Sequence, residues 1–380
     1  MERQPIPRLL EAKIQGRLFG KKAILVFGPR QVGKTTLCME ILRKTDLPYT
    51  IFYGDDADIR EAFAQANGTM LRNLIGDQKI ILIDEAQRIP NIGLCLKIIV
   101  DQLPDVQVIA TGSSSFDLAN LSNEPLTGRK YEFFLYPLSF SEMVKHHGFL
   151  EEKRHLEHRM LYGYYPEIVT HANQEKELLN LLAGSYLYKD LLMLEGIKKP
   201  LILEKLLKAL AMQLGSEVNY NELGQIVGAD KNTVEKYIDL LEKAFVIFRV
   251  PAFNRNVRSE LKKGKKIYFY DCGIRNAILK NFNPLSSRLD VGALWENFFL
   301  VERMKFLAAN NQDAEFYFWR TTAQQEIDFI EESEGNIKAF ECKWNPKTKT
   351  FFPSTFRDAY PYAALKVVNS GNFEEFTLNR

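Results

Sequence analysis

The sequence predicts an α/β protein that begins with a parallel sheet covered by helices and continues into a helical region and a second, smaller α/β module. Short apolar runs alternate with helix-like segments through about the first 110 residues. Helical spacing of apolar residues dominates from about 141 to 245, and strand-like runs return near the end of the chain. Because 380 residues exceed what one compact core usually holds, we expect several domains.

Composition restricts the class of protein. The net charge is +2, so no overall electrostatic field draws the chain to nucleic acid. The four cysteines are scattered without a C-x-x-C pair, which is typical of reduced, buried thiols. The sequence has neither an apolar run of transmembrane length nor a signal-peptide core after Met1. We therefore expect a cytoplasmic protein that does not contact membranes.

The first apolar run, Ala23–Phe27, leads into a glycine-containing loop and a helix from Thr35 to Arg43. The loop matches G-x-x-x-x-G-K-[ST] at every required position. Glycines let backbone N–H groups converge on phosphate oxygens, and the start of a helix favours negative charge. Lys34 is expected to reach the β- and γ-phosphates, and the Thr35 hydroxyl to bind Mg²⁺. The nucleotide-binding residues predicted here are Gly28, Pro29, Arg30, Gln31, Val32, Gly33, Lys34, Thr35 and Thr36.

Further strands are predicted at 49–53, 79–83 and 106–110, each followed by polar residues. Each is apolar enough to be buried on both faces of a parallel sheet, and ligands of such sheets bind at the carboxyl ends of the strands. Asp84 is predicted to hold Mg²⁺, and Glu85 to act as the base that orients or deprotonates water. Ser113 or Ser114 either contacts the γ-phosphate or the attacking water, or belongs to a turn or helix cap.

Arg129 is a candidate arginine finger, a cation that stabilises charge in the transition state of phosphoryl transfer. It could act within its own chain or on a neighbouring one. A solvated loop arginine is the alternative. No guanine-reading N-K-x-D motif occurs in the sequence, which favours ATP over GTP.

Residues 28–36, 81–87, 111–114, 126–129 and 135–140 together resemble the prokaryotic AAA-type ATP-binding proteins. The resemblance spans nearly the whole chain and implies a P-loop NTPase sheet of the AAA+ type, with a C-terminal region of poorly defined function. It strengthens the assignment of Arg129, which matches the family's Gly-Arg position. A helical lid with a second sensor arginine is not recognisable, so hexamer formation is not implied and oligomerisation stays open.

The middle of the chain is predicted to be helical and then to form a winged helix. An ATPase domain at 1–140 precedes a helical connector at 141–199 and a winged helix-turn-helix domain at 200–285. Lysines on the second helix, at 231–245, could contact DNA, as could the lysines of a hairpin at 261–267 with Arg255 and Arg258. Acidic residues on the same helix oppose this interpretation. The five histidines between His146 and His171 lack a clear carboxylate partner, which favours a solvated connector.

Residues 286–380 carry a second acidic set. Glu296 lies on a predicted helix, and Asp328 and Glu341 lie on predicted strands. Period-2 alternation places Glu341 and Lys343 on one face. These four residues resemble the PD-(D/E)XK nuclease superfamily, which implies a second divalent-metal site with Lys343 as the catalytic lysine. Simple charge pairing on an amphipathic strand is the alternative.

Three functional interpretations follow from these patterns. The first is a Mg²⁺-dependent ATPase that couples its nucleotide state to C-terminal modules binding double-stranded DNA or a protein partner. The second is an ATP-dependent DNA nuclease. The third is a signalling or scaffold protein that is switched by nucleotide with little turnover.

Overall fold

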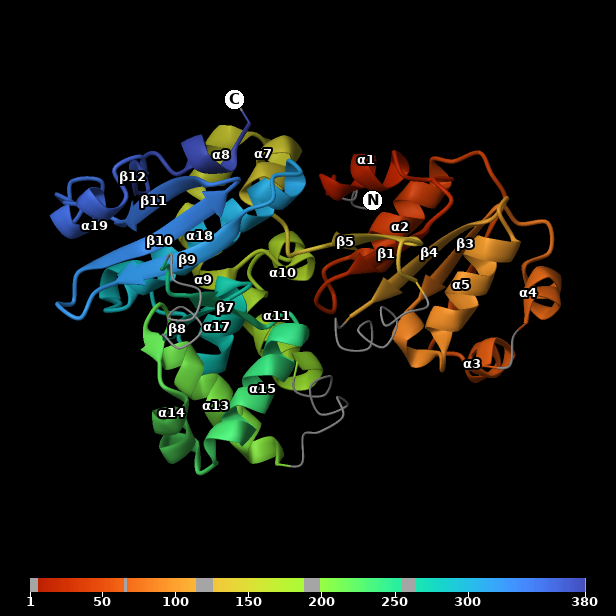
Figure 1. The fold of residues 1–380 in the computed structure, drawn as a ribbon, viewed down its shortest axis with the longest axis horizontal. Helices are drawn as coiled ribbons and strands as arrows, with labels where there is room; N and C mark the ends of the chain where they lie inside the picture. Colours follow the sequence, from red (N-terminus) through yellow and green to blue (C-terminus); the bar gives the residue numbers. More distant parts are fainter. Residues whose placement is uncertain (1–5, 65–66, 114–125, 188–198, 255–263, 380) are drawn as a thin grey trace. The chain divides into compact units, whose positions relative to one another are not determined.

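The computed structural model describes residues 6–64, 67–113, 126–187, 199–254 and 264–379 (Figure 1). The chain divides into two compact units, which are described separately. The first comprises residues 1–137 with 243–245, and the second comprises residues 138–242 with 246–380. Within the described residues, no helix combines the length and apolarity that a membrane crossing requires.

The first unit is built on a parallel sheet, as the sequence predicts, but the sheet has five strands where the sequence predicted four. Its strands, in the order β2-β3-β4-β1-β5, are β1 (Ala23–Phe27), β2 (Tyr49–Tyr53), β3 (Ile80–Asp84), β4 (Gln107–Gly112) and β5 (Lys130–Phe134). The strands β1 and β4 are buried along their whole length. The expectation of full burial is wrong for β2, which lies at the edge of the sheet and has only Phe52 buried.

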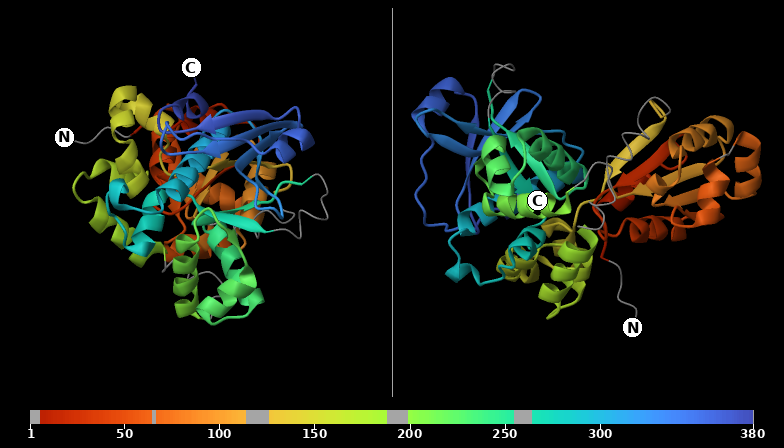
Figure 2. Two further views of the ribbon diagram at one scale, coloured as in Figure 1. Left: turned by 90° about the vertical axis from the view of Figure 1, so that its left-hand side faces the viewer. Right: turned by 90° about the horizontal axis from the view of Figure 1, so that it is seen from below.

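Helices of the first unit pack on the sheet and on one another (Figure 2). They are α1 (Leu10–Gln15), α2 (Lys34–Arg43), α3 (Ala57–Ala64), α4 (Gly68–Ile75), the single turn η1 (Ala86–Arg88) and α5 (Ile92–Gln102). The chain crosses from β1 to β2 in one direction along the sheet and returns through β3 to β4 in the other. Since parallel crossovers are right-handed, this reversal places α2 and α5 on opposite faces.

Two helical groups begin the second unit. The first contains α7 (Phe140–His147), α8 (Phe149–Arg154), α9 (Leu156–Tyr162), α10 (Pro166–Thr170), α11 (Glu175–Leu181) and the π-helical segment η2 (Leu182–Leu187). The second contains α13 (Pro200–Met212), α14 (Tyr220–Val227) and α15 (Lys231–Lys243). Asn219 caps α14 with its side chain, and Gly228 ends that helix in the left-handed conformation, as is common for these two residue types.

A three-stranded antiparallel sheet accompanies these helices, in the order β6-β8-β7. Its strands are β6 (Glu217–Val218), β7 (Ile247–Pro251) and β8 (Lys265–Phe269). They are followed by α17 (Cys272–Leu279) and the turn η3 (Leu285–Ser287). Arg255, Arg258, Lys262 and Lys263 of the predicted hairpin lie outside the described residues.

The chain ends in a mixed four-stranded sheet, β12-β11-β10-β9, with the long helix α18 (Val291–Ala309) on one face. Phe299 of α18 packs on Phe329 and Phe340, while Phe356 packs on Trp319 in a separate buried cluster. The remaining elements are β9 (Glu315–Arg320), β10 (Glu326–Ser333), β11 (Asn336–Cys342), α19 (Ser354–Ala359), β12 (Ala364–Val368) and α20 (Glu374–Thr377).

A buried ion pair ties α18 to this sheet. Arg303 donates two hydrogen bonds to the Glu331 carboxylate, at 2.6 and 2.9 Å, and Lys338 donates a third at 2.8 Å. Burial by itself disfavours the charged carboxylate, but these donors outweigh it and hold the pKa of Glu331 below its usual value. Ionised Glu331 therefore stabilises the folded form.

Replacing Glu331 by Gln is expected to lower the free energy of unfolding at pH 7 by about 3 kcal/mol, because Arg303 keeps a buried charge without its partner. The native pKa is depressed, so this contribution is complete above about pH 4.5 and is lost as pH falls below it. The difference between wild type and variant should shrink accordingly. Urea unfolding followed by tryptophan fluorescence measures it, since all three tryptophans lie in the second unit.

The neighbouring half-exposed Glu332 provides the matched control. Glu332→Gln should change stability by less than about 0.5 kcal/mol. Equal losses in both variants, or a loss in Glu331→Gln that does not depend on pH, would contradict the role of this ion pair.

Candidate functional site

The loop after β1 has the backbone geometry that a phosphate cradle needs. Gly28, Gln31 and Gly33 have φ values of 153°, 62° and 92°. A Cβ at position 28 would lie 2.0 Å from the Leu135 carbonyl oxygen, so only glycine fits there. The helix α2 begins at Lys34 directly after the loop. Its first N–H groups therefore face the loop with the favourable end of the helix dipole.

Lys34 is buried, and the loop itself holds its ammonium group. The Nζ atom donates hydrogen bonds to the carbonyl oxygens of Gly28 at 3.0 Å and Pro29 at 2.9 Å. A buried ammonium requires such partners, and phosphate oxygens are stronger acceptors than carbonyls. Lys34 is thus already inside the loop, in reach of any phosphate bound there.

Arg8 also supports this loop, although no pattern in the sequence points to it. Its guanidinium donates to the Val32 carbonyl oxygen at 2.8 Å and to the Tyr136 carbonyl oxygen at 2.6 Å. These bonds connect the phosphate loop to the segment that follows β5. An arginine near the start of a chain matches no short motif, so only the fold reveals this contact.

Thr35 and Asp84 meet at the carboxyl edge of the sheet, as predicted. The Thr35 hydroxyl lies 2.9 and 3.1 Å from the two oxygens of Asp84. Thr111, to which the sequence assigned no role, donates to Asp84 Oδ1 at 2.5 Å and accepts from the Glu85 N–H at 3.1 Å. A hydroxyl and a carboxylate side by side are oxygen ligands of the kind that Mg²⁺ prefers.

Glu85 adopts the left-handed conformation, with φ 49°, at the end of β3. Its Oε2 atom accepts a hydrogen bond from Gln87 Nε2 at 2.5 Å and lies 3.4 Å from Ser113 Oγ. Gln87 also donates to Ser113 Oγ at 3.0 Å. The structure thus brings Glu85 and Ser113 together and adds Gln87, while Ser114 lies outside the described residues.

Arg129 lies at the amino ends of the strands, whereas the phosphate loop lies at their carboxyl ends. Its carbonyl oxygen accepts a hydrogen bond from the N–H of Ala23, the first residue of β1, whereas the phosphate loop follows the last residue. Five residues of strand separate these ends by about 13 Å. The guanidinium pairs with Asp101 at 2.7 Å. This position disfavours an arginine-finger role within the same chain, and a role on either chain stays a prediction.

In the second unit, Asp328, Glu341 and Lys343 come together. Lys343 Nζ lies 3.1 Å from Asp328 Oδ2 and 3.0 Å from Glu341 Oε2, so the ammonium bridges the two carboxylates. The pairing of β9 with β10 is irregular between Ile327 and Ile330, where Asp328 lies. Burial, and then the charge of Asp328, raise the pKa of Glu341 to about 7.

Glu296 belongs to an adjoining network. It accepts hydrogen bonds from Lys266, at 3.2 Å, and from the Tyr268 hydroxyl. Burial raises the pKa of Glu296 to about 7, although Lys266 opposes the shift and Asp328 adds to it. Among the described residues, the carboxylates of Glu296, Asp328 and Glu341 do not bring three oxygen atoms within 4.8 Å of one another, the spacing at which three side chains could hold one metal ion.

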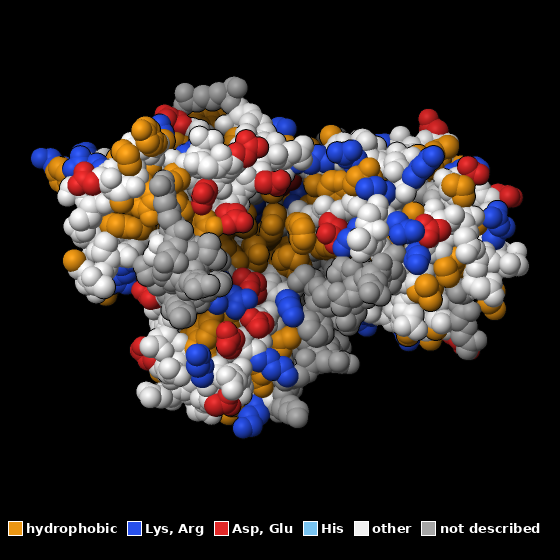
Figure 3. Space-filling model, in the orientation of Figure 1, with side chains coloured by type: hydrophobic (Ala, Val, Ile, Leu, Met, Phe, Trp, Pro, Cys, Tyr) orange, Lys and Arg blue, Asp and Glu red, His pale blue; other side chains and the backbone are white. Residues whose placement is uncertain are grey.

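The position of Lys266 differs from the one that the sequence predicted. It was placed at a hairpin tip where it would contact DNA phosphates, but it is buried in β8 and pairs with Glu326 at 2.5 Å. On α15, Lys231 and Lys236 are exposed. Two acidic residues of that helix, Asp239 and Glu242, are paired with Arg249. Basic and acidic side chains are interspersed over this part of the face drawn in Figure 3.

Comparison with known protein families agrees with the geometry of the first unit. Residues 20–144 match the family model of an AAA domain. The AAA domain is followed by matches to two families described as domains of unknown function, DUF8612 over residues 153–285 and DUF4143 over residues 291–378. The N-terminal part of the chain is thus a P-loop NTPase domain of the AAA class, followed by two regions whose families carry no assigned function.

Similar proteins occur in bacteria and archaea. An uncharacterized protein of Mycobacterium tuberculosis is 28% identical over 338 residues, which cover 87% of this chain and 72% of the relative. One from Methanocaldococcus jannaschii is 23% identical over 345 residues, covering 85% and 75%. A solved signal transduction ATPase from Pyrococcus horikoshii, with a tetratricopeptide repeat sensor, shows 13% identity and a TM-score of 0.29 over 80% of this chain. This chain covers 47% of that protein.

Proposed function

We propose that the chain binds Mg-ATP and hydrolyses it slowly, and that its nucleotide state controls DNA or partner binding by the C-terminal regions. The observation that carries this proposal is the contact between Thr35 and Asp84, with Glu85 beside it, at the edge where the phosphate loop lies. These are the groups that phosphoryl transfer to water requires.

Each residue has a separate part in the proposed reaction. The loop N–H groups and Lys34 hold the phosphates and neutralise the charge that grows on them. Thr35 and Asp84 would hold Mg²⁺, which would supply charge stabilisation at the phosphate oxygens. Glu85 orients a water molecule and accepts its proton as oxygen attacks the γ-phosphorus and the bond to ADP breaks.

The hydrogen bonds around Glu85 support its proposed role. Gln87 and Ser113 both contact the Oε2 atom, which leaves Oε1 as the oxygen without a described hydrogen bond. The proposed base is therefore fixed in direction by its neighbours. Thr111 links this residue to Asp84 through one hydroxyl, so the base and the proposed metal ligand are positioned together.

The proposal is tested by measuring ATP turnover of the purified full chain with Mg²⁺ and with EDTA, each with and without duplex DNA. Slow, Mg²⁺-dependent turnover is expected, and stimulation by DNA would support the coupling. If calorimetry with Mg²⁺ detects binding of neither ATP nor GTP to folded protein, the proposal is wrong. Binding with turnover no higher than background would favour a nucleotide-switched scaffold.

The arrangement of Asp328, Glu341 and Lys343 favours a second candidate function, DNA cleavage. A carboxylate pair bridged by an ammonium group can bind a divalent ion and position water for phosphodiester hydrolysis once the lysine moves aside. This candidate predicts plasmid cleavage by the full chain with Mn²⁺, lost by at least about 100-fold in Asp328→Ala. Exposed Asp313→Ala is the control and should cleave normally. Absence of cleavage by wild type would contradict the nuclease function.

A further inference from the structure

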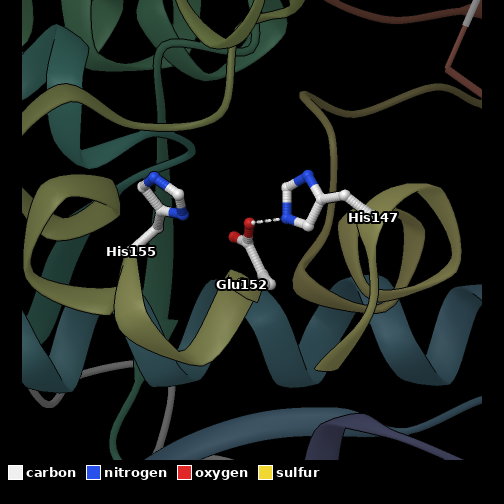
Figure 4. Close-up of side chains that lie close together, drawn as sticks. All are labelled: His147, Glu152 and His155. Atoms are coloured by element: carbon white, nitrogen blue, oxygen red, sulfur yellow. Dashed lines mark hydrogen bonds and ion pairs between the residues drawn. The ribbon is translucent and has the colours of Figure 1, made fainter. Parts of the chain in front are cut away.

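A cluster of histidines in the second unit has a buried carboxylate at its centre, contrary to the expectation from sequence. His147, Glu152 and His155 each bring one possible metal-ligand atom within 4.8 Å of the other two (Figure 4). Within the described residues, this is the one group of three such side chains found at that spacing. None of the three takes part in the proposed ATPase or nuclease site.

Local backbone geometry creates this cluster. His147 ends α7, and Gly148 follows it with φ 95°, a conformation that side chains disfavour. The helix α8 begins directly after Gly148, and its residue Glu152 lies within hydrogen-bond distance of His147 Nε2. Glu152 and His155 are three residues apart on one helical turn, so they share a face. The sequence spacing, H-x₄-E-x₂-H, matches no common motif.

Glu152 is fully buried, and two neighbouring side chains donate hydrogen bonds to its carboxylate. Arg159 donates two hydrogen bonds to its carboxylate, both at 3.0 Å, and the Tyr164 hydroxyl donates a third at 2.6 Å. His147 Nε2 lies 2.8 Å from Oε2, on the more open side. Hydrogen bonds of this kind orient the carboxylate ligands of metal sites. Arg159 also neutralises the carboxylate, which limits how tightly the cluster would attract a cation.

Each of the two imidazoles has a nitrogen that could serve as a metal ligand. His155 Nδ1 donates to the Glu151 carbonyl oxygen at 2.9 Å, so in the neutral ring Nε2 carries the lone pair. His147 Nε2 faces an acceptor and carries a hydrogen, while its Nδ1 lies 3.4 Å from His146 Nδ1. A neutral His147 can therefore move its hydrogen to Nδ1 and offer Nε2 to a metal. The side chains of His147 and His155 are 23% and 40% exposed, so an ion can enter from solvent.

We propose that His147, Glu152 and His155 bind one Zn²⁺ ion, with water completing a four-coordinate site. Two imidazoles and a carboxylate oxygen suit Zn²⁺, with bonds of about 2.0–2.2 Å. Tetrahedral bonds of that length separate neighbouring ligand atoms by about 3.3 Å. The 2.8 Å contact between His147 and Glu152 therefore has to widen by about half an ångström, and a pair of ligand atoms at the 4.8 Å limit has to close by about 1.5 Å.

The test uses the full chain without an affinity tag, stripped of metal and titrated with Zn²⁺ against a coloured chelator. One equivalent is expected to bind with an affinity in the micromolar range or tighter. His147→Asn and His155→Asn should each weaken binding by at least about 100-fold. His171→Asn, which changes an exposed histidine outside the cluster, is the control and should bind as wild type. Glu152 is left intact because it also holds Arg159 and Tyr164.

Co²⁺ provides an independent readout. The Co²⁺-loaded protein should show the intense visible absorption of a four-coordinate ion, absent from both cluster variants. The four cysteines are buried, and a spectrum with thiolate charge-transfer bands would place the ion elsewhere. That result overturns the proposal, as does failure of wild type to bind Zn²⁺ or retention of full binding by both variants. Circular dichroism confirms that the variants are folded.

Discussion

Lys34→Ala is expected to weaken Mg-ATP binding by at least about 100-fold, because the variant loses the cation inside the phosphate loop. The phosphate oxygens carry negative charge, which the carbonyl oxygens of the loop do not, so losing the ammonium removes a charge–charge interaction; a loss of about 3 kcal/mol corresponds to that factor. The Lys34 ammonium contacts the Gly28 and Pro29 carbonyls and so lies within the loop that would hold the phosphates. Isothermal calorimetry with Mg-ATP measures the change directly.

Arg43→Ala is the matched control for Lys34→Ala. Arg43 lies at the other end of α2, and its side chain is 62% exposed. Its removal takes one positive charge from the same helix without touching the loop, so nucleotide affinity should stay within about threefold of wild type. Similar affinity losses in both variants would mean that general electrostatics, rather than the loop lysine, determines binding.

Glu85→Gln is expected to bind Mg-ATP normally while turnover falls by about 10²- to 10⁴-fold, the usual contribution of a general base. Glutamine keeps the shape of the side chain and an oxygen acceptor for Gln87 but cannot take a proton from water. Separate measurements of nucleotide affinity and single-turnover hydrolysis distinguish the two effects.

Exposed Glu61 on α3 provides the control for Glu85, since Glu61→Gln removes a carboxylate from the same unit away from the loop. Its turnover should match wild type. If Glu85→Gln hydrolyses ATP at the wild-type rate, water is activated by another group. If it loses affinity instead, the carboxylate supports the binding site rather than the chemical step.

Elements with strong local signals could be predicted from the sequence. The phosphate loop, the strand ending at Asp84 and the helix capped by Asn219 each carry a motif or cap whose physical cause is local. The edge strand β5 was missed. Its residues Lys130–Phe134 alternate between half-buried and exposed, so they lack the apolar run that identifies a central strand.

Contacts between distant residues account for most of what the sequence could not predict. Arg8 is separated from Tyr136 by 128 residues, and no spacing rule connects them. Lys266 looked like a solvated turn residue because its partners, Glu296 and Glu326, lie 30 and 60 positions further along the chain. Arg129 was assigned from a short pattern, but the direction of its strand, which only the fold supplies, decides what it can reach.

The two carbonyl contacts of Lys34 have a consequence for how tightly any anion can be held. An incoming phosphate would replace existing partners of the ammonium group, so binding exchanges hydrogen bonds more than it adds them. Counting the contacts in a ligand-bound complex would therefore overstate the heat released. The same carbonyl contacts hold the ammonium group within the loop, which reduces the rearrangement that an incoming phosphate would require.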